Sequence, residues 1–162
     1  MSIRSKYESE LKIVFDKLTE MCRAVVEAIE RSVTALKTRD ESLAKLVIAS
    51  DKQIDYKERE IEQDCLKILL MEHPVAGDFR DVSAALKMIT DLERIADQAA
   101  DISELSLQFK NEKFIKQPEH IEAMAKIAVE MVKDGVKSYV DKDLATAREL
   151  DKRDDRVDKL FL

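Results

Sequence analysis

Glycine and proline are scarce in this sequence of 162 residues, with two of each, and tryptophan is absent. Folds rich in β-strands or loops need far more turn residues than these four. Aromatic residues make up only 5% of the chain, which disfavours a β-sandwich and any aromatic platform for stacking single-stranded nucleic acid. The composition therefore predicts an all-α protein.

Long apolar runs are also absent. None is longer than the run of residues 68–71, which is far short of the ~20 residues that a membrane-spanning helix requires. The first residues lack the apolar core of a signal peptide. Cys22 and Cys65 stand at no spacing typical of a metal site or a disulfide framework. We expect a cytoplasmic protein without direct membrane insertion, in which both thiols are reduced and act as small buried hydrophobes.

Positive charge is not in excess in either part of the chain. Residues 1–117 carry 19 basic and 23 acidic side chains, and residues 118–162 carry 9 and 11, for a net charge of −6. Neither part has the basic surface of a nucleic-acid-binding protein, and adhesion to anionic lipid is disfavoured for the same reason. The acidic excess fits a soluble protein or one that binds cations.

Apolar residues recur every three or four positions over three long stretches, which predicts three amphipathic helices. The helices are expected over residues 3–37, about 43–71, and from 74 or 78 to about 109. Pro74 ends the second, because proline disfavours helix in the residue before it and lacks a donor itself. In the third, apolar side chains fill an arc of roughly 160°, so this helix is expected to pack against two others.

The pattern restarts after Pro118. A shift of 103 residues keeps the apolar phase and aligns eight identical residues, which indicates a tandem repeat. The identities are Met21/Met124, Val26/Val129, Glu27/Glu130, Val33/Val136, Asp40/Asp143, Ala44/Ala147, Asp51/Asp154 and Asp55/Asp158. Residues 1–114 are thus predicted to form a three-helix bundle, and residues 118–162 the first two helices of a second, incomplete one. The apolar face of these two helices would need a missing helix, a second chain or disorder, and we expect a homodimer.

The most informative segment lies in the third predicted helix. It reads Asp-Leu-Glu-Arg-Ile-Ala-Asp over residues 91–97, preceded by Lys87 and by the Asp-Phe-Arg step of residues 78–80. This closely resembles the signature of the PhoU family, accessory regulators of the phosphate-specific ABC transporter, whose core reads K-x-x-x-D-L-E-R-I-G-D. The departures are Ala96 for glycine, Gln98 for histidine and Asp101 for asparagine. Family members consist of two tandem three-helix bundles, which matches the repeat described above. The resemblance therefore covers the whole chain.

The resemblance implies a non-enzymatic regulator that represses phosphate-starvation genes when phosphate is plentiful. The implied partners are the ATPase subunit of the phosphate ABC transporter and a sensor histidine kinase, between which such a protein acts as an adaptor. Composition and residue spacing by themselves point to neither partner.

Acidic residues on the second and third predicted helices form rows of like charge. Glu93, Asp97 and Asp101 follow one another at every fourth position, and Asp51 and Asp55 form a similar pair. Such charges repel by a few tenths of a kcal/mol per pair, and cations that prefer oxygen ligands would relieve the repulsion. The PhoU resemblance implies more: members can carry paired E/D-x-x-x-D motifs that hold a multinuclear iron or zinc cluster, and these positions match them.

Two other interpretations stay open. The carboxylates could be the active centre of a metal-storage or redox protein, although neither His73 nor His120 follows a glutamate by three residues, as the E-x-x-H motif of di-iron proteins requires. In a chain with 34 acidic residues they could also be the solvated faces of a plain helical scaffold. Glycine-rich phosphate loops, HExxH and nucleophile elbows are absent from the sequence.

Overall fold

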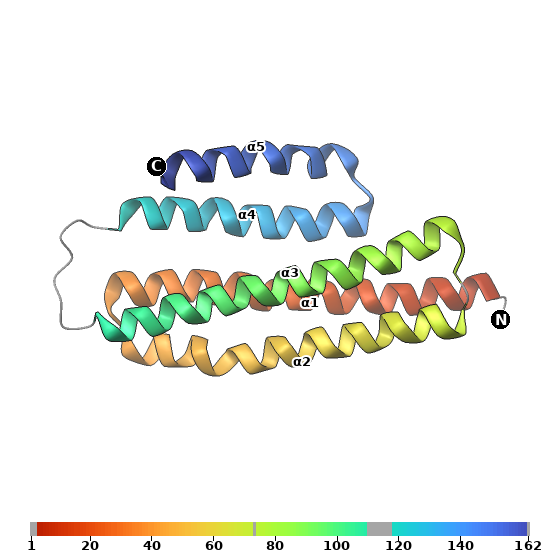
Figure 1. The fold of residues 1–162 in the computed structure, drawn as a ribbon, viewed down its shortest axis with the longest axis horizontal. Helices are drawn as coiled ribbons and strands as arrows, with labels where there is room; N and C mark the ends of the chain where they lie inside the picture. Colours follow the sequence, from red (N-terminus) through yellow and green to blue (C-terminus); the bar gives the residue numbers. More distant parts are fainter. Residues whose placement is uncertain (1–2, 73, 110–117, 162) are drawn as a thin grey trace.

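The computed structural model describes residues 3–72, 74–109 and 118–161, and all regular structure in these ranges is helical. The helices are α1 (Ile3–Thr38), α2 (Glu41–Met71), α3 (Ala76–Gln108), α4 (Glu119–Asp141) and α5 (Leu144–Phe161) (Figure 1). The prediction of an all-α fold is confirmed. Over the described residues, no helix contains an apolar stretch that could cross a bilayer.

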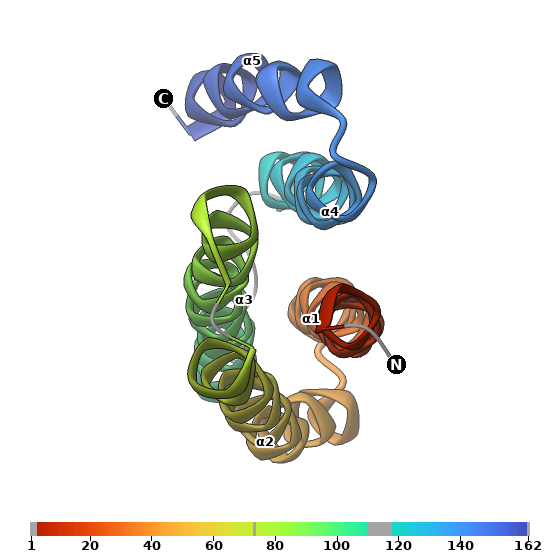
Figure 2. The ribbon, with the colours of Figure 1, turned by 90° about the vertical axis from the view of Figure 1, so that its right-hand side faces the viewer.

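The first three helices pack against one another along their length, as the end-on view of Figure 2 shows. Their core contains the largest fully buried side chains of the described residues, among them Leu18, Met21, Ile61, Ile68 and Ile89. Helix α3 contacts both α1 and α2, which confirms the prediction drawn from its wide apolar arc. The buried members of that arc are Val82, Ala85, Ile89, Leu92, Ala96 and Ala99.

Two turns related by the 103-residue shift have the same geometry. Arg39 after α1 and Lys142 after α4 are both left-handed, with φ of 58° and 56°. The aspartates that follow, Asp40 and Asp143, each accept a hydrogen bond from the backbone N–H three residues later, at 3.0 and 3.1 Å. A left-handed residue that ends one helix and an aspartate that caps the next are common turn devices. The repeat found in the sequence is therefore a structural repeat.

Helix α4 lies along α1, and α5 covers the outer side of α4 (Figures 1 and 2). The sequence predicted an uncovered apolar face over residues 118–162, and for α4 this is wrong. Val129 and Val136 belong to the same buried cluster as the first bundle, and the ring of Tyr139 meets that of Phe15 edge-on at 5.3 Å between centroids. The reason is that α1 presents apolar side chains on two sides, one to α2 and α3 and the other to α4. No described residue of α5 is buried.

The start of α3 joins the two repeats. The Tyr139 hydroxyl of α4 donates a hydrogen bond to the Asp81 carbonyl, and Lys142 Nζ lies 2.7 Å from the Asp81 carboxylate. Burial, and then the charge of Asp81, raises the pKa of Tyr139, so its hydroxyl is a neutral donor at pH 7. These contacts hold the end of α4 against α3.

Candidate functional site

Carboxylates from α2 and α3 converge on one side of the first bundle. Asp51 and Asp55 of α2 and Asp97 of α3 each offer an oxygen atom, and the three oxygens lie within 4.8 Å of one another. The close packing of α2 against α3 brings Asp97 to the two α2 side chains, although it follows them by more than forty residues in the chain. The structure therefore assembles three of the five predicted site residues into one cluster.

Asp51 is the least satisfied member of this cluster. Its Oδ1 atom is buried, and no described residue donates a hydrogen bond to it. Burial raises the pKa of Asp51, and the charges of Asp55, Asp97 and Asp101 raise it further. A buried carboxylate oxygen without a donor costs free energy, and a bound cation would supply the missing positive charge. The residues present thus fit a metal ion.

The other two predicted residues lie beside the group of three. Glu93 is half-buried, and its pKa is raised by burial and by the surrounding carboxylates, which are Asp97, Glu58, Asp55 and Asp51. Asp101 is exposed and lies one turn beyond Asp97 on α3. Its negative charge helps to raise the pKa of Asp51. Glu93 can therefore complete the ligand set of an ion, whereas Asp101 lies at the edge.

The sequence did not point to Thr90. Its hydroxyl faces Glu58 across the α2–α3 interface, with Oγ1 3.4 Å from Glu58 Oε1 and 3.3 Å from the Leu86 carbonyl, so its one proton is shared between these two acceptors. Glu58 follows Asp55 on α2 and continues the acidic row, and Thr90 places a neutral donor opposite it. No sequence signal could have identified Thr90, because only the register between two helices brings it to Glu58.

The donor set of this cluster consists of carboxylate oxygens. Such a set suits hard or borderline cations, and iron and zinc can both take oxygen ligands. The cysteines lie elsewhere, buried in the core as expected. Burial raises the pKa of Cys65 to about 12, so its thiol stays protonated at pH 7 and is a poor metal ligand.

Comparison with known proteins decides the family. The PhoU domain model matches residues 18–106 and 121–162. Over 96% of its length the chain is 34% identical to the phosphate-specific transport system accessory protein PhoU homolog of Aquifex aeolicus, of which it covers 71%. The chain belongs to the PhoU family. The homolog from Clostridium acetobutylicum is also 34% identical, over 98% of this chain and 73% of its own.

A solved structure agrees with this assignment to the PhoU family. The crystal structure of PhoU from Pseudomonas aeruginosa superimposes with a TM-score of 0.91, over 96% of this chain and 75% of that one, at 27% identity. The similarity extends over both repeats, so the predicted tandem arrangement is that of a known PhoU fold.

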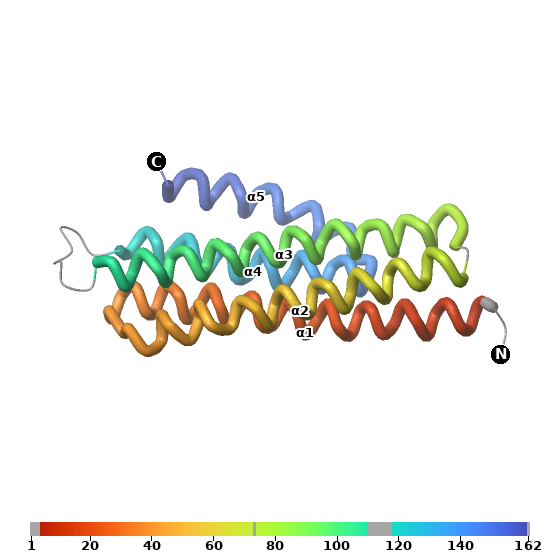
Figure 3. Tube along the Cα trace, turned by 60° about the horizontal axis from the view of Figure 1, so that its bottom comes forward, coloured from red at the N-terminus to blue at the C-terminus, as the bar shows by residue number. Residues whose placement is uncertain are grey.

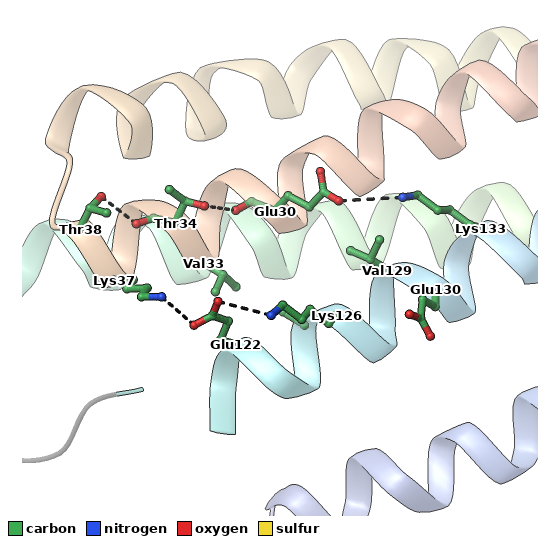
Figure 4. Close-up of a pocket in the computed structure, with 11 residues that line it drawn as sticks. Glu30, Val33, Thr34, Lys37, Thr38, Glu122, Lys126, Val129, Glu130 and Lys133 are labelled. Carbon is green, nitrogen blue, oxygen red and sulfur yellow. Dashed lines mark hydrogen bonds and ion pairs between the residues drawn. The ribbon is translucent and has the colours of Figure 1, made fainter. Parts of the chain in front are cut away.

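The PhoU-family chain also has a groove of about 550 Å³ between the second half of α1 and the first half of α4 (Figure 4). Its apolar lining residues are Val33, Ala125 and Val129. Glu122 pairs with Lys37 at 2.8 Å and with Lys126 at 3.6 Å, and Lys133 pairs with Glu30 at 3.9 Å. Because the lysines that line this groove are all paired with glutamates, it has little attraction for an anion such as phosphate.

Proposed function

We propose that this chain is a non-enzymatic, cytoplasmic regulator of phosphate uptake. It acts as an adaptor between a phosphate ABC transporter and a sensor histidine kinase, and it represses phosphate-starvation genes when phosphate is plentiful. The observation that supports this proposal is the match to PhoU accessory proteins over both helical repeats. Long, rigid helical surfaces are suited to docking on other proteins.

Deletion of the gene tests the regulatory role. In phosphate-rich medium, a reporter driven by a phosphate-starvation promoter should become active in the deletion strain and silent again when the full chain is supplied. Purified chain should also bind the transporter's ATPase subunit and the cytoplasmic part of the kinase. A reporter that stays silent after deletion would contradict the regulatory role.

We also propose that the carboxylate cluster holds iron or zinc. Asp51, Asp55, Glu93 and Asp97 would be the ligands, with Asp101 at the edge of the site. The support is the unpartnered Asp51 oxygen and the convergence of three carboxylates. A bound cation would neutralise the cluster and link α2 to α3.

The ligands are tested by replacing Glu93 and Asp97 together with alanine. Elemental analysis should then find no iron or zinc, while circular dichroism shows unchanged helicity. The matched control replaces Asp151 and Asp155, an exposed acidic pair with the same spacing on α5, and should retain the metal. Unchanged metal content in the Glu93/Asp97 variant would contradict the assignment.

A metal-storage or redox protein is the second candidate function, and the unsatisfied Asp51 carboxylate is the observation in its favour. The two functions differ in turnover. After anaerobic loading with ferrous iron, a regulator should bind metal without consuming oxygen, whereas a redox protein should consume it. Sustained oxygen consumption would favour the second candidate.

We propose, further, that the chain is a homodimer joined through its second repeat. Leu144 and Phe161 at the two ends of α5 are 71% and 80% exposed. Burial of apolar surface contributes ~25 cal/mol per Å², and two α5 helices related by a two-fold axis would cover these side chains against each other. Light scattering should therefore report about twice the chain mass of 18.6 kDa. A monomer of 18.6 kDa would contradict this proposal.

A further inference from the structure

Helix α5 is the one helix in the described part of the chain that contributes no buried residue. Its contacts in the described structure are almost all with α4. It forms the outer edge of the molecule, away from α1 and α2 (Figures 2 and 3). Stability is not uniform within a folded protein, and elements with few buried apolar contacts open first. The packing therefore makes α5 the helix that is easiest to detach.

The internal repeat shows what α5 lacks. Val47 and Ile54 of α2 are each 2% exposed. Their counterparts in α5 after the 103-residue shift, Leu150 and Val157, are only half-buried. The reason is that α2 packs against both α1 and α3, whereas α5 has only α4 on its inner side.

Two polar contacts tie α5 to α4. Arg153 Nη1 lies 2.6 Å from Asp134 Oδ2, and these side chains are 27% and 35% exposed. This is the one ion pair that joins α4 to α5 among the described residues. Near the other end of α5, the His120 ring lies 3.3 Å from the Leu160 carbonyl oxygen. Because both side chains of the ion pair are partly buried, solvent screens this pair less than an exposed one.

Helix α5 also forms one wall of an apolar groove. The groove has a volume of about 220 Å³ and lies between α3 and α4, and Leu150 is the only described residue of α5 that lines it. Its apolar lining residues from α3 and α4 are Met88, Leu92, Ile95, Met131, Val132 and Val136. When α5 moves away from α4, the groove loses the Leu150 wall and becomes wider.

The turn before α5 allows this movement without disturbing α4. Lys142 ends α4 in the left-handed conformation, and its Nζ atom lies 2.7 Å from the Asp81 carboxylate of α3, which fixes this end of α4. The side chain of Asp143 accepts a hydrogen bond from the backbone N–H of Thr146, so the first turn of α5 has its own cap. Hinges consist of a few residues at the ends of such elements.

We propose that α5 is a hinged wall, which moves off α4 as one unit while the other four helices stay folded. The Arg153–Asp134 pair is its latch, and opening gives access to the apolar groove between α3 and α4. The chain thus has two states that differ in the apolar surface they expose beside α3. A ligand that binds the wider groove more tightly would shift the population toward the open state. This inference does not depend on the proposed function.

Cysteine labelling in the full chain measures the opening. Gly135→Cys places a thiol beneath Leu150, and the added Cβ atom would lie 3.6 Å from Leu150 Cδ1, an ordinary contact, so the fold is preserved. The buried Cys22 and Cys65 are the internal reference. Labelling rates with iodoacetamide are divided by the rates of the same thiols in the urea-unfolded chain. The introduced thiol should then react at least about tenfold faster than either native thiol.

The latch is tested in the same background. Arg153→Gln should speed labelling of the introduced thiol about two- to fivefold, the effect expected for the loss of a partly exposed ion pair. Lys152→Gln is the matched control, because this neighbouring cation pairs with Glu149 inside α5, at 2.6 Å, and should label at the unchanged rate. The rates are compared at low protein concentration, since the proposed dimer would hold α5 from its outer side.

Hydrogen exchange provides a second measurement. Most of the stability of a helix comes from its packing, so amides of α5 should exchange faster in Arg153→Gln by the same factor, and those of α2 should not change. An introduced thiol as protected as Cys22 and Cys65 would overturn the proposal, since α5 would then open only with the whole protein. Labelling that Arg153→Gln leaves unchanged would overturn it as well. Equal acceleration of the α2 amides would do the same, because it would show a general loss of stability.

Discussion

Replacing Asp51 with asparagine should stabilise the metal-free protein, whereas most substitutions at half-buried positions destabilise. The buried Oδ1 of Asp51 accepts no hydrogen bond from any described residue, and carboxylate oxygens of Asp55 and Asp97 lie within 4.8 Å. Asparagine keeps the shape of the side chain, removes the charge and adds two N–H donors that the neighbouring carboxylates can accept. The substitution therefore relieves repulsion without opening a cavity.

The size of the gain follows from the number of close charges. Like charges one helical turn apart repel by a few tenths of a kcal/mol, and Asp51 has one such neighbour on α2 and another across the interface on α3. Because solvent reaches part of the side chain and screens these charges, we expect a total gain of about 0.5–1 kcal/mol. For a chain of this size, that gain raises the Tm by about 1–4 °C.

The gain should depend on pH. The raised pKa of Asp51 means that the folded state holds this proton more tightly than the unfolded state, whose carboxyl has its ordinary pKa of 3.8. The wild type therefore loses stability, relative to the asparagine variant, as pH rises above 3.8 and through the folded-state pKa. Below pH 3.8 the Asp51 carboxyl is protonated in both the folded and the unfolded state, so this contribution to the stability difference between wild type and Asp51→Asn disappears.

Thermal unfolding followed by circular dichroism measures the effect. In a chelator at pH 7, Asp51→Asn should melt above wild type, and Asp155→Asn, at an exposed position on α5, should melt with wild type. Added zinc should raise the Tm of wild type by mass action and leave that of Asp51→Asn nearly unchanged. A variant less stable than wild type in chelator would refute the reasoning, because it would show that the Asp51 carboxylate is satisfied in the folded protein.

Two further predictions concern the fold. Ile61 is fully buried, so Ile61→Ala should lower the free energy of unfolding by about 2–5 kcal/mol in urea titrations, and a loss below 1 kcal/mol would contradict its place in the core. Tyr139→Phe removes the hydrogen bond to the Asp81 carbonyl and should cost about 0.5–1.5 kcal/mol. Hydrogen exchange should become faster in α4 and not in α2, and a uniform change would argue against a local anchor.

The helices of the first bundle were predictable because each buries one side against its neighbours. The periodicity predicted residues 3–37 and 43–71, and the structure has Ile3–Thr38 and Glu41–Met71. The repeat predicted that Asp40 and Asp143 occupy equivalent positions, and both cap a helix. The left-handed residues before them were not predictable, since Arg39 and Lys142 have no special preference for that conformation.

The position of α4 was not predictable from periodicity. Its apolar stripe indicated a face that avoids water but not the neighbour that buries it, so an uncovered face was predicted. In the structure, Val129 and Val136 join the core through α1. A stripe shows which side of a helix avoids water, whereas the neighbour depends on how the whole chain closes around a shared core.

The sequence by itself determined that carboxylates recur one turn apart on two helices, because spacing sets the direction of each side chain around its own helix axis. Only the tertiary structure decided which of them meet. Asp97 joins Asp51 and Asp55, and Thr90 faces Glu58, because side chains along the whole α2–α3 interface interdigitate in one register. Periodicity carries no information on how far one helix slides along another. That displacement is set by packing, and it decides whether separate acidic rows become one site.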